Sequence, residues 1–191
     1  RLLMMELMHA DTAPSLYLGR PCYFGLANFQ PYAPIWWTQR RFSREVVTSM
    51  VIALSNFMTL HVDYRIIELY GYSGGGVIAT LMAAEIPQVR RLVTIAAPLD
   101  IDRWTTQHGY SPLEGSLNPY RQPPLRSEIN QIHLVGTTDT IVGADLIEPF
   151  VLKQRNVEFH QIVGFDHNCC WDQIWGDYIG DANVNCVRSV S

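Results

Sequence analysis

Residues 68–87 read ELYGYSGGGVIATLMAAEIP. An apolar run leads into a cluster of glycines that contains one serine, Ser73, and a helix-compatible stretch then continues until Pro87. This order predicts a buried strand over 65–70, a tight turn, and a helix over 75–86 that the proline ends. A single serine in such a turn has three competing explanations: a nucleophile, part of a phosphate-binding loop, or a tight turn without chemistry.

The rest of the chain repeats this alternation of strands and helices. Ser43 is a candidate helix N-cap, and apolar residues then recur at helical spacing to about residue 60. Alternating strands and helices imply right-handed βαβ units, so we predict an α/β fold whose mostly parallel sheet carries helices on both faces. Further strands are expected at 15–20, 89–96, 131–136 and 157–163, and further helices at 1–10, 143–154 and 171–179.

The composition is that of one ordinary globular domain. The chain has 191 residues, of which 48% are hydrophobic and 17% charged, and its formal net charge is −4. Such a charge argues against a basic surface for nucleic acid or anionic lipid. No apolar run approaches the roughly 20 residues that a membrane-spanning helix needs. We predict a single domain over residues 1–191 with a loop-rich insert at about 97–127; the oligomeric state stays open.

Residues 71–75 spell Gly-Tyr-Ser-Gly-Gly, which matches the G-x-S-x-G pattern of a serine nucleophile. Such a pentapeptide arises by chance in about one chain in fifteen of this length, so its context decides its weight. Between a buried strand and a helix, the glycines allow a turn sharp enough to raise Ser73 above the sheet edge. The N-terminus of the following helix offers backbone N–H groups to a developing oxyanion.

A phosphate-binding loop is the main rival explanation. Residues 74–79 also fit G-x-G-x-x-A, the fingerprint of dinucleotide-binding sites. That fingerprint needs an acidic residue at the end of the next strand, but residues 95–98 are Ile-Ala-Ala-Pro and Asp100 comes too late. No lysine follows the glycines, which excludes a P-loop. A dinucleotide site is therefore the weakest of the three explanations.

A serine nucleophile needs a general base, and the base needs an orienting carboxylate. In a parallel sheet both should lie in loops after later strands, on the same edge as the serine. Asp139 follows the strand expected at 131–136, and His167 follows the strand expected at 157–163. Ser73, Asp139 and His167 therefore form a candidate catalytic triad in the chain order Ser, Asp, His.

Each member of this triad has a structural alternative. Asp139 could be a turn residue or the cap of the next helix, with Asp100 and Asp102 as rival acids, and His167 could be a surface histidine. Among the other histidines, those in strands or near helix ends are more often structural, and the one in the insert has no obvious partner; they are His9, His61, His108, His133 and His160.

The four cysteines, Cys22, Cys169, Cys170 and Cys186, make an even count. Buried thiols are one explanation, and a bridge from Cys22 to Cys169 or Cys170 is sterically reasonable at one edge of a parallel sheet. The adjacent pair could also bind a metal with His167, but no C-x-x-C spacing supports this. We expect no metal and no organic cofactor.

Over residues 17–175 the sequence resembles α/β-hydrolases. The resemblance rests on the elbow Gly71–Gly75, Asp139 and His167, and on the segments YLGRPC, GYSGGG, APLD, SLNP and GFDHNCCW. These segments are similar to a group of bacterial cell-envelope serine hydrolases that includes proteins described as lipoproteins. The resemblance implies an α/β-hydrolase fold, a nucleophile at Ser73, a base at His167 and an orienting acid at Asp139.

The same resemblance sets the remaining expectations. It implies that the Gly74 N–H is one oxyanion donor, and that the second donor and the first strands lie upstream of Arg1, so the fold would be N-terminally incomplete. It implies an envelope, periplasmic or secreted location, where disulfides form; Cys22 would then pair with Cys169 or Cys170 and Cys186 with the remaining one. Reduction should then lower activity or thermal stability.

The expected function is hydrolysis of a carboxylic ester of a small molecule through an acyl-enzyme. Tyr72, Trp37 and Trp104 are candidate pocket residues, although these aromatic side chains could equally pack the loops. A peptidase or amidase would use the same triad. A non-catalytic binding protein could retain both the fold and the motif.

Overall fold

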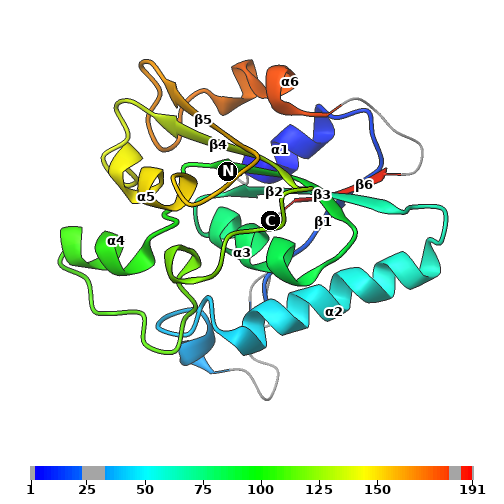
Figure 1. The fold of residues 1–191 in the computed structure, drawn as a ribbon, viewed down its shortest axis with the longest axis horizontal. Coiled ribbons are helices and arrows are strands. Elements are labelled where there is room, and N and C mark those ends of the chain that lie inside the picture. The colour runs from blue at the N-terminus through cyan, green and yellow to red at the C-terminus, as the bar shows by residue number, and fades with distance from the viewer. Residues whose placement is uncertain (1–2, 23–32, 181–185, 191) are drawn as a thin grey trace.

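The computed structural model describes residues 3–22, 33–180 and 186–190. Its centre is a six-stranded sheet in the order β1-β6-β2-β3-β4-β5, and every neighbouring pair of strands runs parallel (Figure 1). This confirms the prediction of a parallel α/β sheet. The strands are β1 (Ser15–Tyr17), β2 (Ile66–Tyr72), β3 (Val89–Ile95), β4 (Asn130–Gly136), β5 (Val157–Ile162) and β6 (Cys186–Val190).

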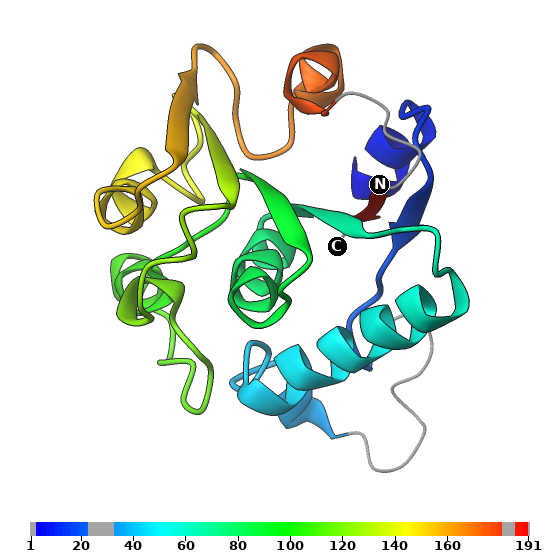
Figure 2. The same ribbon diagram turned by 45° about the vertical axis from the view of Figure 1, so that its right-hand side comes forward.

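Helices cover both faces of the sheet, as the two views show (Figures 1 and 2). One core packs α2, α3 and α5 against one face, and a second core packs α1 and α6 against the other. The helices are α1 (Leu3–His9), α2 (Arg44–Leu60), α3 (Gly74–Glu85), α4 (Ile101–Gln107), α5 (Glu148–Val151) and α6 (Trp175–Tyr178). Four 3-10 turns are named η2 (Pro34–Trp36), η3 (Pro119–Arg121), η4 (Ala144–Leu146) and η5 (Trp171–Gln173).

Local sequence explains the two long helices. Ser43 Oγ accepts the backbone N–H of Val46 at 3.3 Å, which makes Ser43 the N-cap of α2, as predicted. The buried side of α2 then follows helical spacing through Met50 and Leu54. In α3 apolar residues point in every direction, because this helix lies between the sheet and α2 and both neighbours bury it.

Two predicted helices are shorter than expected. The stretch 143–154 divides into η4 and α5, because Pro149 has no N–H to donate back to the preceding turn. The stretch 171–179 likewise divides into η5 and α6. The insert 97–127 is more regular than predicted, since Asp100 caps α4 by accepting the N–H of Arg103.

Strand β6 was not expected from the sequence. It lies between β1 and β2, with Arg188 opposite Glu68 in the parallel register. A short segment that carries an arginine gives little strand signal, and its burial depends on acidic partners far away in the chain. In the part of the chain that the structure describes, no helix is both long and apolar enough to cross a bilayer.

The predicted disulfide pairing is wrong. Cys169 and Cys170 are joined to each other, whereas Cys22 and Cys186 are buried free thiols. Because each member of the adjacent pair is taken by the other, no partner is left for Cys22. In the parallel register Cys186 lies beside Ile66, at the start of β2. It is therefore at the end of the sheet opposite to the loops that follow the strands. Burial raises the pKa of the Cys22 thiol.

Candidate active site

Ser73 lies at a sharp turn between β2 and α3. Its φ of 52° and ψ of −124° are unusual for a residue with a side chain, and its N–H is held by the carbonyl of Ile95 at 2.8 Å. Flanking glycines make the turn fit: a Cβ on Gly71 would lie 2.6 Å from the backbone of Gly75, and a Cβ on Gly76 would lie 2.5 Å from the Cβ of Ala97. The sequence therefore predicted this turn for the correct reason.

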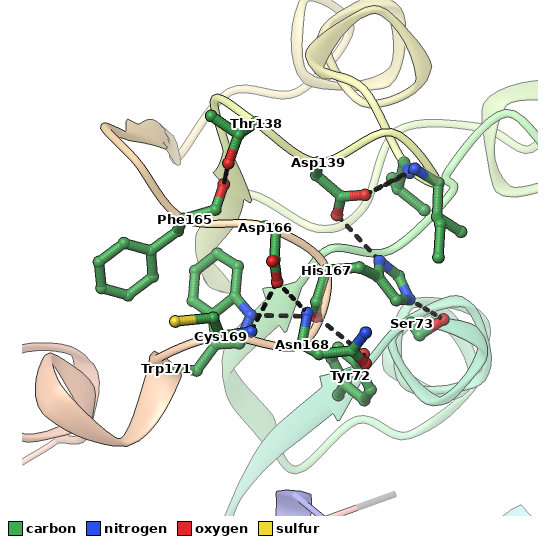
Figure 3. Close-up of polar contacts among 12 residues, drawn as sticks. Tyr72, Ser73, Thr138, Asp139, Phe165, Asp166, His167, Asn168, Cys169 and Trp171 are labelled. Atoms are coloured by element: carbon green, nitrogen blue, oxygen red, sulfur yellow. Dashed lines mark hydrogen bonds and ion pairs between the residues drawn. The ribbon is translucent and has the colours of Figure 1, made fainter.

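The structure brings Ser73, His167 and Asp139 into one hydrogen-bonded chain (Figure 3). His167 Nε2 lies 3.2 Å from Ser73 Oγ, and His167 Nδ1 lies 2.9 Å from Asp139 Oδ2. The side chain of Asp139 is 0% exposed and that of His167 only 10%, while Ser73 is half-buried. A half-buried serine backed by a buried imidazole and carboxylate has the order of groups that acyl transfer needs.

Backbone hydrogen bonds orient the Asp139 carboxylate. Its Oδ1 accepts the N–H groups of Ile141 and Val142, each at 2.8 Å, which leaves Oδ2 for His167. Asp139 is thus also the turn residue that its sequence context suggested. One oxygen shapes the loop and the other binds the imidazole, so its place in the turn is compatible with the predicted role as orienting acid.

Gly136 allows the loop after β4 and the loop after β5 to meet. A Cβ at this last residue of β4 would lie 2.1 Å from the carbonyl oxygen of Phe165, in the loop after β5. That carbonyl also accepts the N–H of Thr138 at 3.0 Å and its hydroxyl at 2.7 Å. The loop bearing His167 is therefore fastened directly to the loop bearing Asp139. Sequence reasoning missed this role, because the partner of Gly136 lies far along the chain.

The backbone of His167 is held by two aromatic residues. Tyr72 Oη donates to the carbonyl of His167 at 2.8 Å, and Trp171 Nε1 donates to the same oxygen at 3.2 Å. The ring of Tyr72 also lies 5.1 Å from the imidazole, centroid to centroid. Burial, with added repulsion from Asp139 and Asp166, raises the pKa of Tyr72 to about 12, so its hydroxyl stays a donor. Tyr72 therefore supports the histidine, and its place in a substrate pocket stays a prediction.

The other carboxylates near these loops have separate partners. Asp166 Oδ1 accepts the N–H groups of Asn168 and Cys169, which lowers the pKa of this exposed carboxyl. It shapes the turn beside His167, visible in Figure 3, and does not contact the imidazole. Asp100 and Asp102, the rival acids, both accept hydrogen bonds from Asn118. Asp139 is the carboxylate that reaches the histidine.

Gly74 is the first residue of α3, so its N–H points out of the helix end beside Ser73. Among the described residues no acceptor is bonded to this N–H. The guanidinium of Arg20 lies 3.5 Å from the position where a side chain on Gly74 would begin. The oxyanion role of Gly74, and of a second donor upstream of Arg1, stays a prediction.

The two candidate pocket tryptophans differ in position. Trp104 lines a cavity of about 780 Å³ between η2 and the insert, whereas Trp37 follows η2 half-buried and does not line it. His108, in the insert, joins Trp104 in donating to the carbonyl of Ile141. This link between the insert and the Asp139 loop had no signal in the sequence.

The remaining histidines lie away from the triad. His133 is fully buried beside Thr94 and Phe150, and His160 pairs with Glu158 at 3.1 Å. Within the ranges that the structure describes, no group of three or more His, Cys, Asp or Glu side chains is arranged to hold a metal ion.

Comparison with solved structures identifies the fold. One similar structure is MGS-MChE2, an alpha/beta hydrolase enzyme from the metagenome of sediments of the Mar Chica lagoon in Morocco: the TM-score is 0.56 and the identity 18%, over 88% of this chain and 87% of that one. Another is VinJ, with a TM-score of 0.57 and 12% identity over 84% and 85% of the two chains. This chain has the α/β-hydrolase fold. No family model and no curated protein matches the sequence.

The α/β-hydrolase fold explains why residues 73, 139 and 167 converge. Each follows a different strand of one parallel sheet, and the carboxyl ends of parallel strands meet at the same edge. At such low identity the likeness concerns the fold alone. The function of this site depends on its own side chains, because one fold supports many different activities.

Proposed function

We propose that this chain is a serine hydrolase that cleaves a carboxylic ester through an acyl-enzyme. The observation that carries the proposal is the buried hydrogen-bonded chain from Asp139 through His167 to Ser73, with distances of 2.9 and 3.2 Å. Its order and burial match the requirement for a nucleophile, a base and an orienting acid.

The first half of the reaction forms the acyl-enzyme. Ser73 Oγ attacks the ester carbonyl carbon while its proton passes to His167 Nε2. Asp139 keeps the Nδ1 proton in place and stabilises the imidazolium. The oxyanion of the tetrahedral intermediate accepts the Gly74 N–H at the positive end of α3. When the intermediate collapses, the C–O bond to the alcohol breaks and the alcohol takes the proton from His167.

The second half releases the acid. Water attacks the acyl carbon as His167 Nε2 removes its proton, and the Ser73–acyl bond then breaks with that proton returning to Oγ. Neither half requires a redox change, and the protons balance between the serine, the water and the imidazole. The same residues could cleave an amide, so the preference for esters is the finer part of this proposal.

An activity-based probe tests the nucleophile. A fluorophosphonate should label the wild-type chain at Ser73, and Ser73→Ala should abolish labelling. Ser55→Ala is the matched control, because Ser55 is exposed on α2 and should leave labelling unchanged. Labelling that survives in Ser73→Ala contradicts the role of Ser73 as the nucleophile. Labelling that never appears in the wild type contradicts catalysis and favours a binding protein of the same fold.

A pair of matched substrates tests the reaction class. A p-nitrophenyl ester and the p-nitroanilide of the same acid present one acyl group on two leaving groups. We expect the wild-type chain to hydrolyse the ester with the higher kcat/KM. A higher kcat/KM for the anilide would instead identify an amidase, while leaving the role of Ser73 intact.

A further inference from the structure

A cavity of about 780 Å³ separates the segment 35–41 from residues 104–113 of the insert. Its size lies within the range of small-molecule sites in proteins, which is about 300–1,000 Å³. Among the described residues that line it, Arg41 is charged and no lining residue is acidic. The cavity therefore carries a positive charge that no acidic residue in its own wall offsets.

Aromatic side chains form one side of this cavity. The rings of Trp104 and Tyr110 meet edge to face at 5.2 Å, and Tyr110 stays 55% exposed. Ile35 and Leu113 supply aliphatic surface in the same cavity. An exposed aromatic ring next to aliphatic side chains can bind a flat apolar ligand, because the ligand would shield both the ring and the aliphatic surface from water.

The guanidinium of Arg41 is held in place but not neutralised. Its Nε donates to the carbonyl of Thr38 at 2.7 Å, and in the described part of the chain no carboxylate pairs with it. A guanidinium oriented by its own backbone loses less freedom when its terminal nitrogens bind a ligand. Those nitrogens bind a carboxylate in a bidentate manner.

The cavity is also connected to the catalytic acid. Trp104 Nε1 donates to the carbonyl of Ile141 at 3.1 Å, and His108 Nε2 lies 2.9 Å from the same oxygen. The N–H of Ile141 in turn binds Asp139 Oδ1 at 2.8 Å. Ile141 therefore links Trp104 in the cavity wall to Asp139, because its carbonyl binds Trp104 and its N–H binds the Asp139 carboxylate.

We propose that this cavity binds a small organic anion with a flat aromatic body, an aryl carboxylate, and that its occupancy stabilises the Asp139 loop through Trp104. The aromatic body would lie against Trp104 and Tyr110, and the carboxylate on Arg41. Binding itself does not depend on catalysis at Ser73, so this site and the proposed hydrolase activity can fail separately.

Titration calorimetry with 2-naphthoate tests the binding, and 2-naphthylmethanol is its neutral comparator. The wild type and Ser73→Ala should bind 2-naphthoate equally well. Arg41→Gln should lower the affinity for 2-naphthoate about tenfold, because the ligand carboxylate loses its charge-assisted pair with the guanidinium. The affinity for 2-naphthylmethanol should stay unchanged. Arg41→Lys keeps the charge but loses the bidentate guanidinium, so its affinity for 2-naphthoate should lie between those of the wild type and Arg41→Gln.

A second cavity supplies the matched control. Arg65 lines a separate space of about 490 Å³ beside Tyr64 and Met58, so Arg65→Gln removes an arginine from a comparable setting. It should leave 2-naphthoate binding unchanged. The proposal is overturned if 2-naphthoate does not bind, if the acid and the alcohol bind equally, or if Arg41→Gln and Arg65→Gln have the same effect.

Hydrogen exchange tests the link to the acid loop without any substrate. In the wild type, 2-naphthoate should slow exchange of the amides of Ile141 and Val142, which bind Asp139 Oδ1. Trp104→Phe keeps an aromatic wall but removes the Trp104 donor to the carbonyl of Ile141 and leaves that of His108, so the same ligand should protect these amides less. Equal protection in both proteins would disprove the transmission through Trp104.

Discussion

Tyr72 Oη donates a hydrogen bond to the backbone carbonyl of His167 at 2.8 Å. The residue immediately before Ser73 therefore fixes the backbone of the histidine whose imidazole Ser73 binds. Tyr72 binds the backbone carbonyl of His167, and Ser73 binds the imidazole ring of the same residue. The turn at the end of β2 thus determines the position of Ser73 and also the distance from Ser73 to the imidazole of His167.

Tyr72→Phe should lower turnover more than it lowers stability. It keeps the ring on the imidazole but removes the donor, and Trp171 still donates to the carbonyl of His167. We expect a loss of about 1 kcal/mol in the free energy of unfolding. We also expect kcat to fall about tenfold with KM little changed, because His167 is less well placed. Steady-state kinetics and urea unfolding measure the two effects.

Tyr64→Phe is the control for this substitution. Tyr64 is half-buried, and its hydroxyl makes no hydrogen bond with the described residues, so removing it should leave both kcat and stability unchanged. If Tyr72→Phe also leaves kcat unchanged, Tyr72 has no positioning role.

Gly136→Ala should damage both the site and the fold. The added Cβ would lie 2.1 Å from the carbonyl of Phe165, so the loop that carries His167 must move away from Asp139. Overpacking of this kind costs about 1–3 kcal/mol, and a shift of about 1 Å at a catalytic group costs about a hundredfold in rate. We expect a lower unfolding midpoint together with loss of fluorophosphonate labelling.

Gly176→Ala provides the comparison, because a Cβ there meets nothing within 4 Å. This substitution in α6 should be neutral or slightly stabilising, as alanine favours a helix over glycine. Equal behaviour of the two variants would show that the contact of Gly136 with Phe165 does not matter.

Strong local patterns made most of the fold predictable. Apolar runs bounded by turn residues placed β2 to β5 within two residues of their observed ends, and the rule that parallel strands end at one edge selected Asp139 and His167. The features that were missed depend on distant partners. The burial of Arg188 in strand β6 depends on acidic groups from elsewhere, and the role of Tyr72 depends on a carbonyl 95 residues away.

Reduction should change the stability very little. A disulfide stabilises mainly by restricting the unfolded chain, and the ring between Cys169 and Cys170 encloses adjacent residues. Reduction should therefore lower the free energy of unfolding by at most about 1 kcal/mol. The bridge first expected from Cys22 would close a loop of roughly 150 residues and contribute about 5 kcal/mol. Urea unfolding with and without dithiothreitol distinguishes the two, and a large loss on reduction would restore the pairing with Cys22.

Stability should fall in mild acid because of His133. Burial lowers the pKa of His133 to about 3, and its buried Nε2 has no hydrogen-bond partner among the residues that the structure describes. An unfolded histidine has a pKa of about 6.5, so between about pH 6.5 and pH 3 the unfolded chain binds more protons than the folded one. The unfolding free energy should therefore drop as pH falls through this window, by on the order of 2 kcal/mol from pH 7 to pH 5.

His133→Leu should remove this contribution, because leucine does not titrate. It will cost some stability at pH 7, since Thr94 loses its partner at 2.7 Å. The diagnostic quantity is the slope of unfolding free energy against pH, which should be flatter in the variant. Parallel slopes for the two proteins would contradict a buried neutral His133.

Arg188 should be the most stabilising charged residue of the sheet. Its side chain is 2% exposed and binds the carboxylates of Asp11 and Glu68 and the carbonyl of Gly180. Tyr70 Oη donates to the same Glu68 carboxylate at 2.7 Å. Arg188→Met would leave two carboxylates buried without their cation, so we expect a loss of about 3–5 kcal/mol in urea unfolding.

The size of this effect separates a buried network from an exposed ion pair. Arg44 pairs with Glu85 at 3.3 Å on the surface, with side chains 66% and 32% exposed, so Arg44→Met should cost no more than about 1 kcal/mol. Adding Glu68→Gln and Asp11→Asn to Arg188→Met should recover part of the loss, because the buried negative charge is removed. If Arg188→Met costs no more than Arg44→Met, the network does not fasten β6 to β2.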